Sequence, residues 1–369
     1  MNRLHTLLYI VLSFTLSQSD NIPLIRMTPV DVEALILEDE NAPSGGRQRY
    51  AQTLDVNIDL FEQGALSIDE NGDKTWELSI KSGNAIGLKL HFNEFYIPEG
   101  GSLMIYGDDG MFDIQTYANN HPDEQYVNRL LKGELITLEY FEPYSVNELA
   151  KIKISKIYHA YKDVFQFYES SSNDRGCSYN VACDEQETGG AFEDQINSVI
   201  FLDMNGSICS AVLVNNTAQD LTPYVLTANH CVATDPYSSD NATTGITYYY
   251  YFYFNHQSSS CNANGNPWTP YNNDYVYRGT LVAAYGISDF ALFELDNSPS
   301  TLWNPDPYYA GWSRYTSSPI ISAGIHHPGG EPKEINYDND AAFQDGWWPG
   351  NWNTHWGLAW DEGGTEGGS

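Results

Sequence analysis

The sequence predicts an all-β fold, because apolar residues alternate with polar ones along short runs and turn-forming residues separate these runs. Turn sequences such as Asn71-Gly72 lie between the earlier runs, so the region before residue 169 is expected to be a β-sandwich. In that region the pattern predicts strands at 54–60, 86–92, 102–106, 135–140 and 152–154. After residue 176 it predicts strands at 196–202, 208–214, 222–227, 246–254, 280–284 and 290–295.

The N-terminal residues predict that the protein is exported. A basic start, an apolar run at 7–12 and small residues before Asp20 are typical of a secretory signal peptide, which we assign to residues 1–19. The apolar run is well short of the roughly 20 residues that a membrane-spanning helix needs. Residues 20–50 are polar and acidic, and we expect them to form a solvated lead-in. The predicted location is therefore secreted and extracellular.

Charge and cysteine content limit the partners and the chemistry. The chain has 49 acidic and 17 basic residues, and its formal charge of −32 would repel nucleic acid and anionic membrane surfaces, so neither is an expected partner. Export favours disulfide bonds among the five cysteines, which all follow a polar boundary stretch at 169–176. Because five is odd, one cysteine is either free or pairs beyond Ser369. The cysteines are Cys177, Cys183, Cys209, Cys231 and Cys261.

One segment carries the residue types of nucleophilic catalysis, Thr-Ala-Asn-His-Cys at 227–231. A serine hydroxyl attacks well only when a neutral imidazole takes its proton and a carboxylate orients that imidazole. His230 is the candidate base, and Asp289, which heads an alternating strand, is the candidate carboxylate. The alternatives are a structural histidine and a turn aspartate that caps its strand. A bridge between Cys209 and Cys231 would hold the loop that presents the imidazole.

These features occur together in a known family. Residues 177–369 resemble the lysyl endopeptidase branch of the trypsin-like serine proteases, which implies a chymotrypsin-like double β-barrel. The region before Cys177 resembles the β-rich propeptides that precede such enzymes in secreted bacterial precursors. The segments that carry the resemblance are the Cys-x5-Cys spacing of 177–183, then 194–199, 210–217, 227–231, 288–290, 310–312 and 325–328.

The resemblance also implies roles for single residues. It makes His230 the general base and Asp289 the acid that orients it. It pairs Cys177 with a cysteine near the C-terminal end of the protease domain, and the chain contains no such cysteine, so Cys177 is expected to be unpaired here. The disulfides that it implies are Cys209 with Cys231 and Cys183 with Cys261.

The last residues, 363–369, resemble the approach to the family's Gly-x-Ser-Gly-x-Pro nucleophile loop. If Thr365 and Glu366 set the register, Ser369 is the x and the attacking serine is the next residue. If 367–369 is itself the Gly-x-Ser, Ser369 is the nucleophile. In either register the second barrel is expected to be incomplete, and this chain by itself is expected to be inactive.

The sequence therefore predicts the precursor of a serine endopeptidase, which hydrolyses protein or peptide substrates as a monomer without a cofactor or a metal. After Cys177 the only basic residues are Arg278, Arg314 and Lys333. An enzyme that cuts after basic residues would digest its own exposed ones, so this depletion favours such a specificity, and the resemblance favours Lys. The alternative is that an acidic protein simply has few basic residues. The expected domains are a signal peptide at 1–19, the lead-in at 20–50, a β-rich propeptide at 51–168, a linker or processing region at 169–176 and the protease domain at 177–369. Within the processing region, the bond after Arg175 is the expected self-processing site.

Two other functions compete with this prediction. A catalytically inactive protease-like module for binding or adhesion would keep the barrels and lose the nucleophile, although the retention of both His230 and Asp289 counts against it. A metallopeptidase would use His326, His327 and His355, but these residues lack a metal-ligand spacing such as His-Glu-x-x-His.

Overall fold

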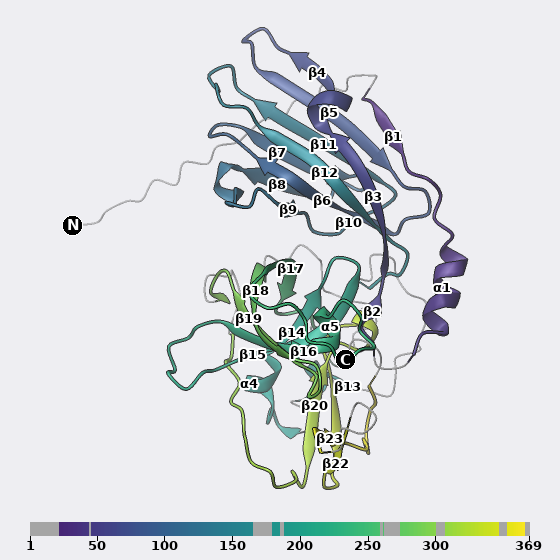
Figure 1. The fold of residues 1–369 in the computed structure, drawn as a ribbon, viewed down its shortest axis with the longest axis vertical. Coiled ribbons are helices and arrows are strands. Elements are labelled where there is room, and N and C mark those ends of the chain that lie inside the picture. Colours follow the sequence, from purple (N-terminus) through teal and green to yellow (C-terminus); the bar gives the residue numbers. More distant parts are fainter. Residues whose placement is uncertain are drawn as a thin grey trace, which may run out of the picture.

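The computed structural model describes residues 22–43, 46–164, 179–184, 188–258, 261, 274–299, 307–346 and 353–365. Over these ranges the chain folds into an N-terminal β-sandwich and a second unit built around a closed β-barrel, and the two follow one another along the long axis of the molecule (Figure 1). The predicted all-β class is confirmed. Among the described residues, no helix is both long and apolar enough to cross a bilayer.

The sandwich consists of two sheets that share one apolar core. Alternating residues of both sheets, such as Leu90 and Leu138, are fully buried between them, as the sequence pattern predicts. The first sheet has the order β1 (Leu24–Arg26), β5 (Lys74–Lys81), β11 (Leu135–Glu142), β7 (Ser102–Gly107) and β8 (Phe112–Thr116), with β4 (Ala65–Ile68) beside β5. The second has the order β10 (Leu131–Lys132), β6 (Gly87–Tyr96), β12 (Lys151–Ala160) and β3 (Ala51–Asp59), with β9 (Tyr126–Val127) beside β6.

The barrel is closed because its end strands, β14 and β15, pair with each other as well as with their neighbours. Its interior is filled by alternating side chains such as Leu213, Val225 and Phe293. In order around the barrel, the described strands are β14 (Val199–Asp203), β17 (Thr247–Tyr253), β18 (Tyr275–Tyr285), β19 (Phe290–Leu295), β16 (Tyr224–Ala228) and β15 (Ser207–Val214).

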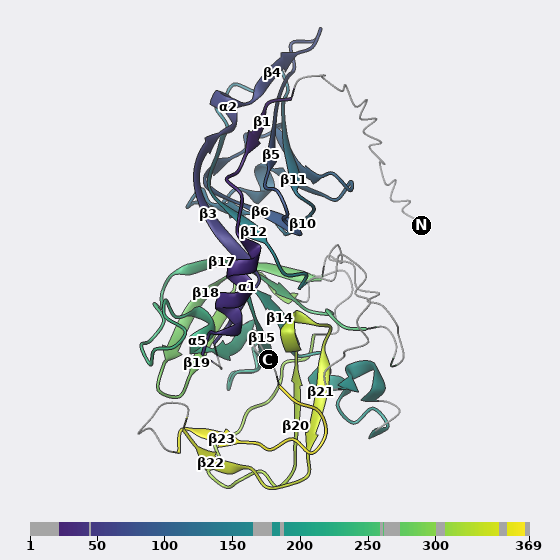
Figure 2. The same cartoon turned by 90° about the vertical axis from the view of Figure 1, so that its right-hand side faces the viewer.

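The other described strands of the second unit form two smaller sheets at the far end of the molecule from the sandwich (Figure 2). Within the described ranges, these strands do not close into a second barrel. One sheet has the order β13 (Tyr179–Asn180), β21 (Glu334–Asp338) and β20 (Ser322–His326), and the other pairs β22 (Phe343–Asp345) with β23 (His355–Gly357). Among the described residues, the short helices are α2 (Leu60–Gln63), η1 (Tyr117–Asn119), η2 (Val181–Cys183), α4 (Glu193–Ile196), α5 (Asn229–Val232) and η4 (Pro328–Gly330).

The described part of the lead-in forms regular structure, and most of its side chains are at least partly exposed. It contains β1, α1 (Val32–Glu40) and β2 (Gln48–Arg49). The acidic residues at the end of α1 are used in ion pairs, since Asp39 lies 2.8 Å from the Arg49 guanidinium and 2.6 Å from the Lys162 ammonium. β2 pairs with β15 of the barrel, so this part of the lead-in joins the second unit.

The two units share a buried junction. Apolar and tyrosine side chains from both pack into one cluster, with Tyr50 and Val127 on the sandwich side and Phe201 and Tyr251 on the barrel side. Lys89 of β6 crosses this junction. Its ammonium lies 2.8 Å from the Asp203 carboxylate, and both side chains are fully buried.

Candidate active site

His230 is presented by a single helical turn at the end of a barrel strand. β16 ends at Ala228, and α5 follows directly. The buried side chain of Asn229 anchors this turn to the next loop, because its Oδ1 accepts the N–H of Ala242 at 2.8 Å and its Nδ2 donates to the Asp240 carbonyl at 2.9 Å. The turn is therefore held in place by a residue inside the segment that the sequence singles out.

Asp289 holds His230 through both of its carboxylate oxygens. Its Oδ2 accepts a hydrogen bond from the imidazole Nδ1–H at 2.6 Å, and its Oδ1 accepts the backbone N–H of His230 at 2.8 Å. Its own carbonyl accepts the N–H of Asn229 at 3.0 Å. Asp289 has a φ of 50°, a left-handed conformation that aspartate tolerates better than most residues. This conformation lets one residue bind the His230 turn through its side chain and its backbone.

The geometry prepares the other ring nitrogen, Nε2, to accept a proton. A carboxylate can only accept hydrogen bonds, so the hydrogen of the neutral imidazole is on Nδ1 and the lone pair is on Nε2. The His230 and Asp289 side chains are 14% and 9% exposed, so the pair is shielded from bulk water without being sealed. This arrangement suits a general base that a carboxylate orients.

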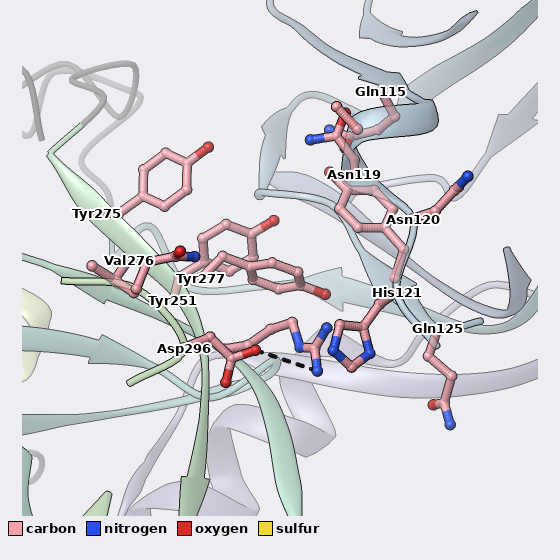
Figure 3. Close-up of a pocket in the computed structure, with 14 residues that line it drawn as sticks. Gln115, Asn119, Asn120, His121, Gln125, Tyr251, Tyr275, Val276, Tyr277 and Asp296 are labelled. Atoms are coloured by element: carbon pink, nitrogen blue, oxygen red, sulfur yellow. Dashed lines mark ion pairs between the residues drawn. The ribbon is translucent and has the colours of Figure 1, made fainter. Parts of the chain in front are cut away.

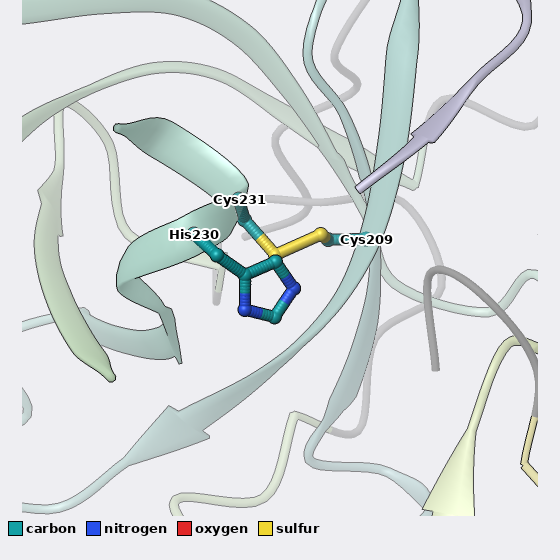
Figure 4. A group of neighbouring side chains, drawn as sticks. All are labelled: Cys209, His230 and Cys231. Carbon is teal, nitrogen blue, oxygen red and sulfur yellow. A yellow bond between two sulfur atoms is a disulfide. The ribbon is translucent and has the colours of Figure 1, made fainter. Parts of the chain in front are cut away.

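A disulfide is the next restraint on the same turn. Cys231 is bonded to Cys209 of β15, and the imidazole of His230 lies beside this bridge (Figure 4). The bond joins residues 22 apart, a closure worth about 3 kcal/mol in the chain-entropy model. A second bridge joins Cys183 to Cys261. These are the two pairs that the resemblance implies, and Cys177 lies outside the described residues.

The comparison with known families agrees with this geometry. A model of the lysyl endopeptidase C-terminal domain matches residues 171–369, which include the barrel, His230 and Asp289. The chain belongs to the lysyl endopeptidase family. The resemblance drawn from the sequence is confirmed to that extent, and membership makes the second unit a relative of secreted serine peptidases.

Two groups of described side chains have the atoms and the proximity to hold a metal. The first is Cys209, His230 and Cys231, but both sulfurs are already bonded to each other, so neither offers a thiolate. The second is Asp338, Asp340 and Asp361. There the buried Asp338 carboxylate accepts hydrogen bonds from the backbone N–H groups of Asp340 and Ala359 at 2.9 and 3.1 Å. It therefore already binds the backbone at both of these positions.

The histidines of the metallopeptidase alternative are engaged with separate neighbours. His326 Nε2 accepts a hydrogen bond from Asn336 at 2.9 Å, and His327 Nδ1 donates to the Glu331 carbonyl at 3.0 Å. His355 lies in the β22–β23 hairpin. Neither metal-capable group among the described residues includes any of these histidines. Burial lowers the pKa of both His326 and His327, which fits neutral side chains that are packed in the fold.

Asn336 of β21 anchors the segment that resembles the approach to the nucleophile loop. Its Nδ2 donates to the Gly364 carbonyl at 2.5 Å. Gly363 has a φ of 90°, and a Cβ there would lie 2.2 Å from the Asn336 side-chain oxygen, so glycine is required. The sequence offers no pattern around Asn336 that would identify this role. Residues 366–369, which include Ser369, lie outside the described residues.

A cavity of about 370 Å³ lies at the junction of the two units (Figure 3). Many of its polar side chains bond to their own unit, as Asn120 does with the backbone of Ile97 and Gln125 does with His91. On the barrel side the cavity is lined by tyrosines of β17 and β18 and by Arg278. None of its lining residues belongs to α5 or to the turn before β19, so it is separate from the catalytic candidates.

Proposed function

We propose that this protein is the precursor of a secreted serine endopeptidase and that His230 and Asp289 form the base half of its catalytic triad. The observation that carries this proposal is the hydrogen bond of 2.6 Å between the His230 Nδ1–H and the Asp289 carboxylate, inside the region that matches the family. A histidine and an aspartate 59 residues apart have no local reason to meet in this geometry.

In the proposed reaction, Nε2 of His230 takes the proton of the attacking serine hydroxyl as the oxygen bonds to the scissile carbonyl. The imidazolium then gives that proton to the leaving amine, and an acyl-enzyme remains. Water repeats the two steps and releases the acid. Asp289 keeps the hydrogen on Nδ1 throughout and stabilises the imidazolium by its negative charge. The resemblance assigns the nucleophile to the segment that starts at Gly363, either Ser369 or the residue after it.

The proposed specificity is for basic residues before the scissile bond, with Lys favoured. The burial of basic residues after Cys177 supports this specificity. Arg278 is 5% exposed and Lys333 is 1% exposed, whereas Arg314 is exposed. Lys333 donates to the Ile196 carbonyl at 2.7 Å, and burial lowers its pKa to about 7. A protease that cuts after such residues would be protected from its own copies by this distribution.

The domain roles belong to the same proposal. Residues 1–19 would direct export, 51–168 would be a propeptide, and 169–176 would contain the processing site, including the bond after Arg175. The mature enzyme would act as a monomer on protein or peptide substrates, without a metal or a cofactor. The acidic charge of −32 supports the expectation that nucleic acid and anionic membranes are not partners.

The test is to incubate the full-length protein with a fluorophosphonate, which labels activated serines, and to map the labelled peptide by mass spectrometry. We expect a single labelled serine at or directly after Ser369 and hydrolysis of peptides after Lys. His230→Ala should abolish both labelling and hydrolysis. A wild-type protein that is folded but neither labelled nor active would favour the inactive binding or adhesion module. Cleavage after apolar or acidic residues would contradict the proposed specificity.

A further inference from the structure

The turn that carries His230, which we define as residues 229–233, contacts a side chain from outside the family-matched region. Arg47 lies in the lead-in, and its Nη1 donates to the carbonyls of Cys231 and Ala233, both at 3.1 Å. The last carbonyls of a helix have no partner inside it, and α5 is only four residues long. The Arg47 guanidinium therefore supplies hydrogen bonds that this helix cannot make for itself.

Arg47 is held over the turn by its neighbours in the chain. Gln48 and Arg49 form β2, which pairs with Ile208 and Ser207 of β15, beside Cys209. The backbone N–H of Tyr50 donates to the Gly206 carbonyl at 2.9 Å. The segment before the first sandwich strand thus runs along the barrel strand that also bears the disulfide to Cys231, so Arg47 acts from a fixed position.

The restraints on the His230 turn come from different sides. Asp289 binds its start through the N–H groups of Asn229 and His230, and the disulfide binds Cys231 to β15. Arg47 binds the end of the turn through the Cys231 and Ala233 carbonyls. Without Arg47, the end of the turn keeps the hydrogen bond from the N–H of Ala233 to the Asn229 carbonyl and the disulfide at Cys231, and the Cys231 and Ala233 carbonyls lose the guanidinium.

We propose that Arg47 is a positioning residue for His230, so that the catalytic geometry of the unprocessed chain depends on a lead-in residue that the family-matched domain does not contain. This inference rests on the proposed function. It assigns to the lead-in a role in the reaction itself, because a displacement of about 1 Å at a catalytic base lowers the rate by roughly a hundredfold.

The experiment uses the full-length protein with Arg175→Ala in every variant, so that processing after Arg175 does not remove the lead-in, and it compares Arg47→Ala, Arg47→Lys and the control Arg26→Ala. Arg26 lies on β1, which pairs with β5 of the sandwich. Amide hydrogen exchange of residues 229–233 reports the turn, and kcat and KM on a Lys-containing peptide report the reaction. For Arg47→Ala we expect exchange to rise roughly tenfold or more and kcat to fall at least about tenfold, with KM within about twofold of the wild type.

The Lys variant separates positioning from general stability. It keeps the charge and one donor group, so both exchange and kcat should lie between the wild type and Arg47→Ala. If Arg47→Ala does not fold, Arg47→Lys tests the inference by itself, because it should show the same changes in exchange and in kcat with a smaller magnitude. Arg26→Ala should match the wild type in both measurements.

Two results would overturn the inference. One is wild-type exchange at 229–233 together with wild-type kcat in a folded Arg47→Ala protein. The other is a rise in KM at unchanged kcat, which would assign Arg47 to substrate binding. If the wild-type protein hydrolyses no peptide, the proposed function fails by itself, and the exchange data still decide whether Arg47 holds the turn.

Discussion

The sandwich and the barrel each contain a histidine that is hydrogen-bonded to a side chain typical of catalytic sites. In the barrel, His230 donates to Asp289 at 2.6 Å, and the two side chains are 14% and 9% exposed. In the sandwich, His159 Nδ1 lies 2.7 Å from the Ser82 hydroxyl oxygen, but these residues are 0% and 1% exposed. Burial lowers the pKa of His159. A serine that is hydrogen-bonded to a histidine therefore does not form a catalytic site when burial keeps substrates away from both side chains.

The difference follows from where the strands place the two histidines. His159 lies within β12 and is paired to strands on both sides, so its ring packs inside the sandwich. His230 lies just after β16, where the chain leaves the barrel wall. Catalytic groups are commonly found at such strand ends, because a rigid sheet holds them while the loop leaves them accessible.

The largest expected effect tests the barrel pair directly. Asp289→Asn would allow the wrong imidazole tautomer while it keeps the geometry, so kcat on a Lys-containing peptide should fall roughly 10⁴-fold. Ser82→Ala is the matched change in the sandwich and should leave kcat within about twofold. A decrease of less than about tenfold in Asp289→Asn would show that this pair is structural, like the pair in the sandwich.

The next effect concerns the ion pair that joins the two units. Lys89→Ala would leave the fully buried Asp203 without its cation, so the free energy of unfolding should fall by about 3–5 kcal/mol in a urea titration. Lys74→Ala is the control within the sandwich, because the Lys74 side chain in its ion pair with Glu142 is 40% exposed, and it should cost about 1 kcal/mol or less. Equal losses of unfolding free energy in Lys89→Ala and Lys74→Ala would contradict a larger contribution from the buried ion pair at the junction.

A smaller effect concerns acid stability on the barrel side. Burial lowers the pKa of His256 to about 4, and its ring stacks on that of His327. Between about pH 6.5 and pH 4 the unfolded state therefore binds more protons than the folded state, and stability should fall as the pH falls through this window, by roughly 3 kcal/mol from His256.

His256→Gln removes this titration, so urea titrations at several pH values should show a shallower loss of stability with acid than the wild type. Some loss should remain, because burial also lowers the pKa of His327. If His256→Gln lost stability with acid as steeply as the wild type, the acid loss would not come from His256.

The smallest expected effect lies in the sandwich pair. Ser82→Ala removes the hydrogen bond to His159 and leaves a buried ring nitrogen without its partner, which should cost about 1–2 kcal/mol of unfolding free energy. Thermal or urea unfolding measures it. A loss of activity in this variant at full stability would mean that the sandwich pair affects catalysis, against the comparison made above.

Local patterns in the sequence were sufficient to predict much of the fold and of the site. Strand β19 (Phe290–Leu295) was predicted with these bounds, because alternation records which side of a sheet is buried. β1, β4, β5 and β8 were not predicted, and β1 is only three residues long. His230 and Asp289 could be proposed because each lies in a recognisable segment beside a strand. Asn336 could not, because its role depends on Gly364, 28 residues away in the sequence.

The sequence by itself determined the all-β class, most barrel strands and the two residues of the candidate pair, since short-range alternation and residue chemistry carry that information. Only the tertiary structure decided that β2 extends the barrel sheet, that Lys89 meets Asp203, and that Arg47 binds the His230 turn. Lys89 and Asp203 are 114 positions apart in the sequence, and Arg47 and Cys231 are 184 positions apart. No local pattern encodes such pairs, because they form only when the barrel closes and the sandwich packs against it.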